Sequence, residues 1–118
     1  MPVARENAAA IEAFWQAWNE ERLDDALEIY SPDARLCHLT HAIEVVGRDE
    51  IGELMKQALK LFPGRRSECV HAHAAGDVVI TEMHWHGIAA DSGQSRAVDI
   101  CYIFRFVNGK VVEQREYG

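Results

Sequence analysis

The hydrophobic spacing of this chain changes from a helical period to a strand period near its middle. Within residues 11–18, apolar side chains recur three and four positions apart, which predicts an amphipathic helix that ends near Asn19. From Arg66 onward, apolar and polar residues alternate in four long segments separated by turn residues. A chain with helices first and a meander of strands after them is expected to be α+β, with helices on one face of a curved sheet.

Two further helices and a short strand pair are expected before Arg66. The apolar spacing of residues 23–30 is typical of a short helix, which Ser31-Pro32-Asp33 would break. Strands are expected at residues 34–40 and 43–46. A third helix is expected to begin after Gly47, with acidic residues in its first turn, and to end at Pro63-Gly64.

The alternation in the second half of the chain predicts four strands, at residues 66–74, 78–88, 97–107 and 110–117. Asn108-Gly109 is the strongest turn signal, because both residues accept the positive φ angles of a tight hairpin. Before that turn, alternation places four apolar side chains on one face, which we expect to be the interior. They are Ile100, Tyr102, Phe104 and Phe106.

Length and charge limit the possible partners. The 118 residues predict one domain, residues 1–118, and 19 acidic against 12 basic side chains give a net charge of −7. This charge argues against binding to nucleic acid or to an anionic membrane, because both need excess Lys and Arg. No apolar stretch is long enough to span a membrane, and the first residues lack a signal-peptide layout, so a cytoplasmic location is expected. The three cysteines form no C-x-x-C motif, so no zinc site is expected from them.

Several segments resemble the nuclear transport factor 2-like superfamily, which includes ketosteroid isomerase, limonene epoxide hydrolase and SnoaL-like polyketide cyclases. Residues 46–51 (Val-Gly-Arg-Asp-Glu-Ile) are similar to the opening of the third helix in that group. Residues 77–82 resemble the start of a central strand of the epoxide hydrolases, and residues 104–117 resemble the final hairpin. The resemblance implies a cone-shaped fold, in which a curved, mixed sheet wraps around helices and encloses one internal pocket.

The hairpin of residues 66–88 has two faces that differ in composition. Val70, Ala72, Val79, Thr81, Met83 and Trp85 form the more apolar face, which the resemblance to epoxide hydrolases also places inside. Cys69, His71, His73, Ile80, Glu82, His84 and His86 form the other face. A slip of one residue would exchange them, and a looser match to ketosteroid isomerase favours that slipped register, so both remain open.

The resemblance also implies three catalytic candidates. His38 corresponds in position to the general-base carboxylate of ketosteroid isomerase, and Glu116 to the water-activating aspartate of the epoxide hydrolases. If both face the pocket, they would form a histidine–carboxylate pair that raises the basicity of the imidazole. Tyr102 lies near the position of an oxyanion-stabilising acid, and its phenol could donate the same hydrogen bond.

Other positions depart from the family pattern. The epoxide hydrolases need an arginine and an aspartate two residues apart on the central strand, where this chain has Met83 and Trp85. The tyrosine that isomerases place on the first helix is Phe14 here. We expect the pocket wall to bind a small apolar molecule through Phe14, Trp15, Trp18, Leu36, Met55, Leu59, Met83, Trp85, Ile100 and Phe104. No metal or other cofactor is expected, because the chain has no glycine-rich phosphate loop and no metal quartet.

Three functions stay open. The first hypothesis is a cofactor-free isomerase or cyclase that uses acid–base chemistry on a carbonyl-bearing apolar substrate. The second is a hydrolase that activates water, and the third is a binding or accessory module without catalysis. A homodimer is expected through the outer sheet face, formed by His71, His73, Glu82, His84, His86, Ile103 and Arg105. The four histidines and Glu82 of this face could also bind a metal ion. Alternate residues of a strand lie in a flat array, however, which does not form a closed tetrahedral shell, so a metal site is disfavoured.

Overall fold

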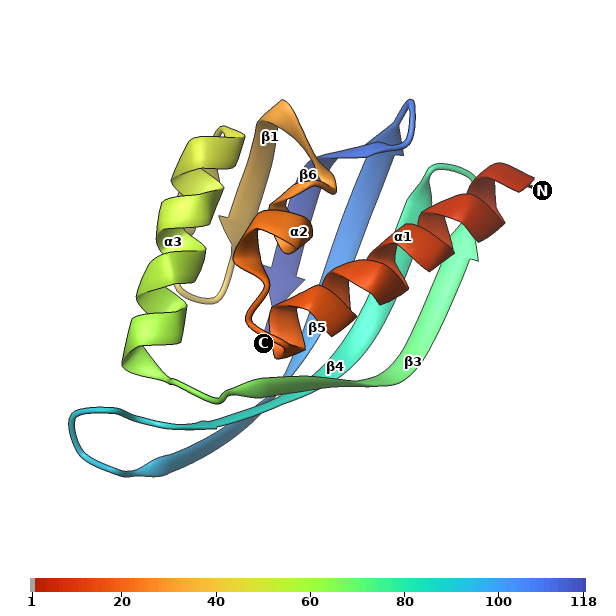
Figure 1. Ribbon diagram of the computed structural model, residues 1–118. Helices are drawn as coiled ribbons and strands as arrows, with labels where there is room; N and C mark the ends of the chain where they lie inside the picture. Colours follow the sequence, from red (N-terminus) through yellow and green to blue (C-terminus); the bar gives the residue numbers. More distant parts are fainter. Residues whose placement is uncertain (1) are drawn as a thin grey trace.

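Three helices lie on one face of a six-stranded sheet in the computed structural model, which describes residues 2–118 (Figure 1). The helices are α1 (Pro2–Asn19), α2 (Leu23–Leu27) and α3 (Arg48–Leu61). The strands are β1 (Tyr30–His38), β2 (Ile43–Val46), β3 (Arg66–Ala75), β4 (Val78–Ile88), β5 (Ser95–Val107) and β6 (Lys110–Tyr117). The expected α+β class and cone-type architecture are confirmed, although the sheet does not close on itself.

The strand order is β2-β1-β6-β5-β4-β3, and only β1 and β6 pair in parallel. This pairing brings the two halves of the chain together, because β1 precedes α3 and β6 is the last strand. Figure 1 shows α1 crossing β3–β5, while α3 lies in front of β1 and β2. The helices thus cover the two ends of one sheet face (Figure 1).

The core forms where the apolar stripe of α1 meets the inward face of β5. Phe104 is fully buried, with its ring centroid 5.9 Å from that of Phe14, and Tyr102 packs edge-on against Trp15 at 4.7 Å. Burying a side chain of this size stabilises the fold by roughly 1.5–3 kcal/mol. The alternation that predicted an inward face on residues 100–106 therefore gives the correct side of the strand.

The end of α3 is fixed to the β4–β5 hairpin. The backbone N–H of Ala90 donates to the carbonyl of Leu61 at 2.8 Å. Figure 1 shows this hairpin extending past the rest of the sheet, beneath the end of α3. The contact holds the first residues of β5 beside the last turn of the helix, where they contribute to the pocket described below.

The expected helix over residues 23–30 is too long. In the structure α2 ends at Leu27, and Tyr30 is the first residue of β1 and fully buried. The Val111 N–H donates to the Ile29 carbonyl, and the Arg48 guanidinium donates to the Tyr30 carbonyl. These long-range bonds satisfy the backbone in an extended form, so tertiary pairing overrides the local helical spacing.

The register of β4 is the one favoured by composition, with Val79, Thr81 and Met83 buried. The expected faces of β3 are wrong in part, because a bulge between Cys69 and His71 shifts its pairing with β4. Val70, expected inside, is 58% exposed, whereas Cys69 pairs with inward-facing Met83. A bulge inserts one extra residue and thereby reverses the alternation beyond it.

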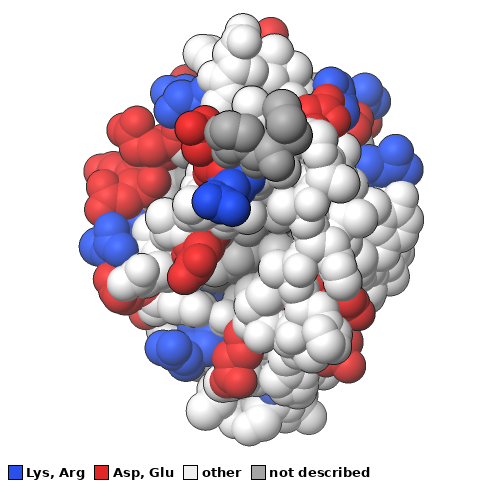
Figure 2. All heavy atoms as spheres, turned by 90° about the vertical axis from the view of Figure 1, so that its right-hand side faces the viewer, with Lys and Arg blue, Asp and Glu red and all other residues white. Residues whose placement is uncertain are grey.

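Charged side chains of both signs are interspersed on the molecular face in Figure 2, and Lys and Arg form no continuous patch on it. Among residues 2–118, no helix is both long and apolar enough to cross a membrane.

Candidate functional site

A cavity of about 540 Å³ lies between the sheet and helices α1 and α3. Its lining is mainly aromatic and aliphatic, with polar groups contributed chiefly by β1, β5 and β6. The lining residues are Phe14, Trp15, Trp18, Leu36, His38, His41, Ile43, Leu54, Met55, Gln57, Ala58, Leu61, Phe62, Trp85, Arg96, Val98, Ile100, Tyr102, Gln114 and Glu116. An apolar enclosure with a few polar groups is the usual form of a small-molecule site.

Three titratable side chains stand in one row across neighbouring strands. Glu116 of β6 is in register with His38 of β1 on one side and with Tyr102 of β5 on the other. All three line the cavity. Residues in register share a sheet face, so the pairing of β1, β6 and β5 brings these side chains together from three distant parts of the chain.

The centre of the row is the contact between His38 and Glu116. Nε2 of the imidazole lies 3.8 Å from Oε1 of the carboxylate, and the two side chains are only 15% and 12% exposed. This distance is beyond a direct hydrogen bond. The two groups therefore face each other with both atoms free to contact a third molecule in the cavity.

A buried chain of hydrogen bonds holds the carboxylate of Glu116. Gln114 donates from Nε2 to Oε2 of Glu116 at 2.8 Å, and Tyr30 donates its hydroxyl hydrogen to Oε1 of Gln114. Gln114 and Tyr30 are both buried in the core. One oxygen of Glu116 is thus fixed by Gln114, which leaves Oε1 directed at His38.

Burial governs the protonation of this pair. It raises the pKa of Glu116 to about 7, although the Gln114 hydrogen bond acts in the opposite direction. The pKa of His38 is lowered, first by burial and then by the charge of nearby His41, whose ring centroid is 4.6 Å away. Sequence reasoning expected Glu116 to make His38 more basic, but burial and the charge of His41 make the imidazole less basic. Near pH 7 the imidazole is neutral and the carboxyl is about half ionised.

Tyr102 is suited to donate rather than to lose its proton. Burial and the neighbouring Glu116 hold the pKa of its phenol well above the ordinary value. Its ring packs between Trp15 and Phe104, which fixes its orientation. A neutral phenol in a partly dry site can stabilise a developing negative charge on a substrate oxygen.

The structure places most of the predicted binding residues on the cavity wall. Those that line it are Phe14, Trp15, Trp18, Leu36, Met55, Trp85 and Ile100. Leu59, Met83 and Phe104 do not line it, because they pack in or against the core. Phe104 in particular is covered by Phe14 and Trp15 of α1.

Four polar lining residues were missed by sequence reasoning, namely Gln57 of α3, Gln114, Arg96 and His41. Gln114 shares the alternation of Glu116 and could have been found from it. Arg96 shares the alternation of Ile100 but lies just before the expected strand start at residue 97. His41 sits in the turn between β1 and β2, where no pattern indicates which way a side chain points.

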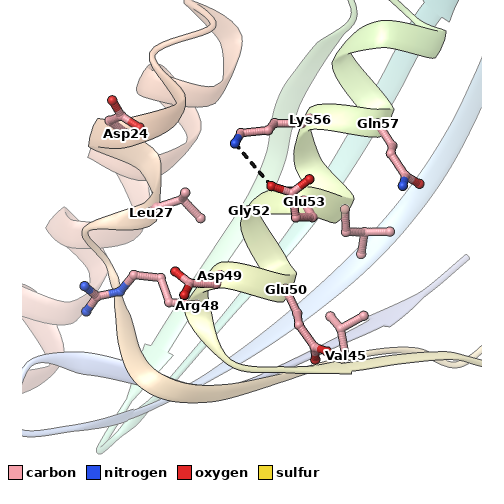
Figure 3. A pocket seen from close by; sticks show the side chains of 11 residues that line it. Asp24, Leu27, Val45, Arg48, Asp49, Glu50, Gly52, Glu53, Lys56 and Gln57 are labelled. Atoms are coloured by element: carbon pink, nitrogen blue, oxygen red, sulfur yellow. Dashed lines mark hydrogen bonds and ion pairs between the residues drawn. The ribbon is translucent and has the colours of Figure 1, made fainter.

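A larger hollow of about 860 Å³ lies elsewhere, between α2, α3 and β2 (Figure 3). Its lining is rich in charged groups, such as Asp49 and Glu50, and Lys56 pairs with Glu53 at 3.2 Å. It contains neither a histidine nor a buried carboxylate, so we place the candidate site in the smaller cavity. Within the described part of the chain, no three His, Cys, Asp or Glu side chains gather closely enough to hold a metal ion.

Residues 11–114 match the family model of the SnoaL-like domain. No curated protein matches the sequence significantly.

Solved structures share the fold over nearly the whole chain. A proposed SnoaL-like polyketide cyclase from Jannaschia sp. CCS1 is 19% identical, with a TM-score of 0.90, 99% of this chain covered and 88% of that one. AclR, a proposed hydroxylase from Streptomyces galilaeus, is 26% identical, with a TM-score of 0.84 and coverages of 97% and 75%. A ketosteroid isomerase-like protein from Catenulispora acidiphila DSM 44928, solved with trimethylamine, is 16% identical, with a TM-score of 0.84 and coverages of 92% and 84%.

Proposed function

The chain belongs to the SnoaL-like domain family, and from that premise we propose that it is a cofactor-independent isomerase or cyclase. In this proposal it removes a proton from a carbon atom next to a carbonyl group of an apolar molecule. The observation that carries the proposal is the buried row of His38, Glu116 and Tyr102 at the wall of an apolar cavity.

Each member of the row has a distinct part in the proposed reaction. Neutral His38 accepts the proton at Nε2, and ionised Glu116 stabilises the imidazolium that forms 3.8 Å away. Tyr102 donates a hydrogen bond to the substrate oxygen as the carbonyl becomes an enolate. The enolate then takes the proton back from His38 at another carbon. Alternatively, it attacks a second carbonyl and closes a ring, and the alkoxide that forms takes the proton from His38.

The pKa values support this division of work. Above pH 7 Glu116 is ionised and His38 is neutral, which is the state the step requires. Tyr102 keeps its proton in the same range because its pKa is raised. A base whose pKa lies close to the working pH both accepts and releases protons efficiently.

Proton exchange at carbon tests the proposal without knowledge of the natural substrate. We would incubate the protein with α-tetralone and β-tetralone in D₂O and follow deuterium entry beside the carbonyl by NMR. Wild-type protein should accelerate exchange over buffer, and His38→Gln and Glu116→Gln should each lose at least about tenfold of that acceleration. Glu113→Gln is the matched control, since Glu113 pairs with Arg105 and does not line the cavity.

The alternative functions give different outcomes. A hydrolase would incorporate labelled oxygen from water into an electrophilic substrate and would not exchange the tetralone protons. A binding module would bind both ketones with no exchange beyond that of buffer. Either result would overturn the isomerase or cyclase proposal.

A further inference from the structure

Arg96 is a charged residue on the wall of an otherwise apolar part of the cavity. It lies in β5 on the same sheet face as Val98, Ile100 and Tyr102 and in register with Gly87 of β4. The side chain of Arg96 is exposed, and Gly87 beside it carries no side chain. The hairpin that carries it is the one held beneath the end of α3 (Figure 1).

The guanidinium of Arg96 has no carboxylate within 4.0 Å among residues 2–118. Arg22, Arg35, Arg65 and Arg105 each have an acidic partner, whereas Arg96 shares the lack of one with Arg5, Arg48, Arg66 and Arg115. What distinguishes Arg96 is that no other arginine among residues 2–118 lines this cavity. The one carboxylate that lines the cavity, Glu116, belongs to the row with Tyr102 and faces His38.

Arg96 and the row of His38, Glu116 and Tyr102 occupy separate parts of the cavity wall. Arg96 precedes Tyr102 by six residues on one strand, which is at most about 20 Å along the backbone. Both residues line the same cavity, and Arg96 also borders a second hollow formed by residues 63–64, 86–88 and 95–97. The rest of the cavity wall is mainly apolar and includes Trp18, Met55, Phe62, Trp85, Val98 and Ile100.

We propose that the molecule bound here is an amphipathic carboxylic acid, whose carboxylate pairs with Arg96 while its apolar body fills the cavity. The assignment of the molecule's other end as the reacting end, next to His38 and Glu116, rests on the proposed function. The contact between its carboxylate and Arg96 does not. A carboxylate suits the site better than a phosphate, because its single charge is matched by one guanidinium and its two oxygens fit the N–H fork.

Ligand binding can be followed by tryptophan fluorescence, because all three tryptophans of the chain line the cavity. They are Trp15, Trp18 and Trp85. We would titrate the protein at pH 8 with decanoate and with decanol, both below their aggregation limits, and follow tryptophan fluorescence. These probes share an apolar chain and differ in the carboxylate. Arg96→Gln removes the proposed contact, and Arg66→Gln is the matched control, because exposed Arg66 lies in β3 and lines no pocket described above.

We expect wild-type protein to bind decanoate at least about fivefold more tightly than decanol. Arg96→Gln should abolish that preference while leaving decanol binding unchanged, and Arg66→Gln should keep it. The proposal is overturned if wild-type protein does not prefer decanoate, or if Arg96→Gln and Arg66→Gln bind decanoate equally well. The assay requires no turnover, so loss of the decanoate preference and loss of tetralone exchange report separate failures.

Discussion

Nε2 of His38 and Oε1 of Glu116 face each other at 3.8 Å across the parallel pair of β1 and β6, although 78 positions separate the two residues. Burial moves both groups toward their uncharged forms, with the pKa of Glu116 at about 7 and that of His38 below its ordinary value. The free energy of unfolding and the chemistry of the site should therefore both depend on pH near neutrality.

Glu116→Gln should stabilise the fold at high pH. A carboxyl whose pKa rises from 4.5 to about 7 on folding imposes no penalty below pH 4.5, an increasing one between these values, and the full one above pH 7. The full penalty is about 3 kcal/mol, so urea unfolding at pH 8 should show a gain approaching that size. At pH 4 the variant and wild type should be equally stable, and Glu113→Gln should show no such pH-dependent gain.

His38 contributes the opposite slope. Its lowered pKa means that the unfolded state binds its proton more tightly, so its contribution to stability falls as the pH drops below 6.5. Both proteins in the comparison keep this histidine, so its effect largely cancels in their difference. An equal stability difference at pH 4 and pH 8 would contradict the assignment of the raised pKa to Glu116.

Proton exchange should increase as the pH rises through about 7. The proposed step needs ionised Glu116, whose pKa lies there, and neutral His38, which is already present in that range. The measurement is the rate of deuterium entry into β-tetralone, corrected for buffer, between pH 5.5 and about 8.5. A rate that stays level down to pH 5.5 would show that Glu116 is not required in its ionised form.

Gln114→Leu should move that profile to higher pH. The Gln114 hydrogen bond lowers the pKa of Glu116, so its loss leaves burial unopposed. The same change leaves the Tyr30 hydroxyl buried without a partner, which costs roughly 1–3 kcal/mol of stability. Adding Tyr30→Phe should recover part of that stability without restoring the profile. Recovery of both would indicate that Gln114 acts only as a packing residue.

The outer sheet face should form a homodimer contact. On this face His73 pairs with Glu82, and His86 pairs with Glu68. Ile103 lies in register with Ile80 on the same face. Ile103→Lys should place a charge in the middle of this face and convert a dimer to a monomer in sedimentation velocity. A wild-type monomer at concentrations of about 0.1 mM would contradict the expectation, as would an unchanged dimer in the variant.

Some features follow from local sequence and match the structure closely. Asn108 and Gly109 both adopt positive φ, as their turn requires, and the third helix starts after Gly47 and ends just before Phe62. The inward set of β5 follows from alternation alone, since Phe104 and Phe106 are buried. Spacing along one element indicates which side of it is apolar, and an apolar side is almost always turned to the core.

Other features depend on contacts that no local pattern contains. Tyr30 reads as the end of a helix but becomes a strand residue because β6 pairs beside it, and the β3 bulge turns Val70 outward. Local spacing was enough to predict most of the elements, the apolar faces of β4 and β5, and the family that the chain resembles. Long-range strand pairing places Glu116 between His38 and Tyr102, with Gln114 hydrogen-bonded to it and Arg96 on the wall of the same cavity. The physical reason is that local spacing specifies the side to which a residue points, whereas strand pairing over long separations decides what that residue meets there.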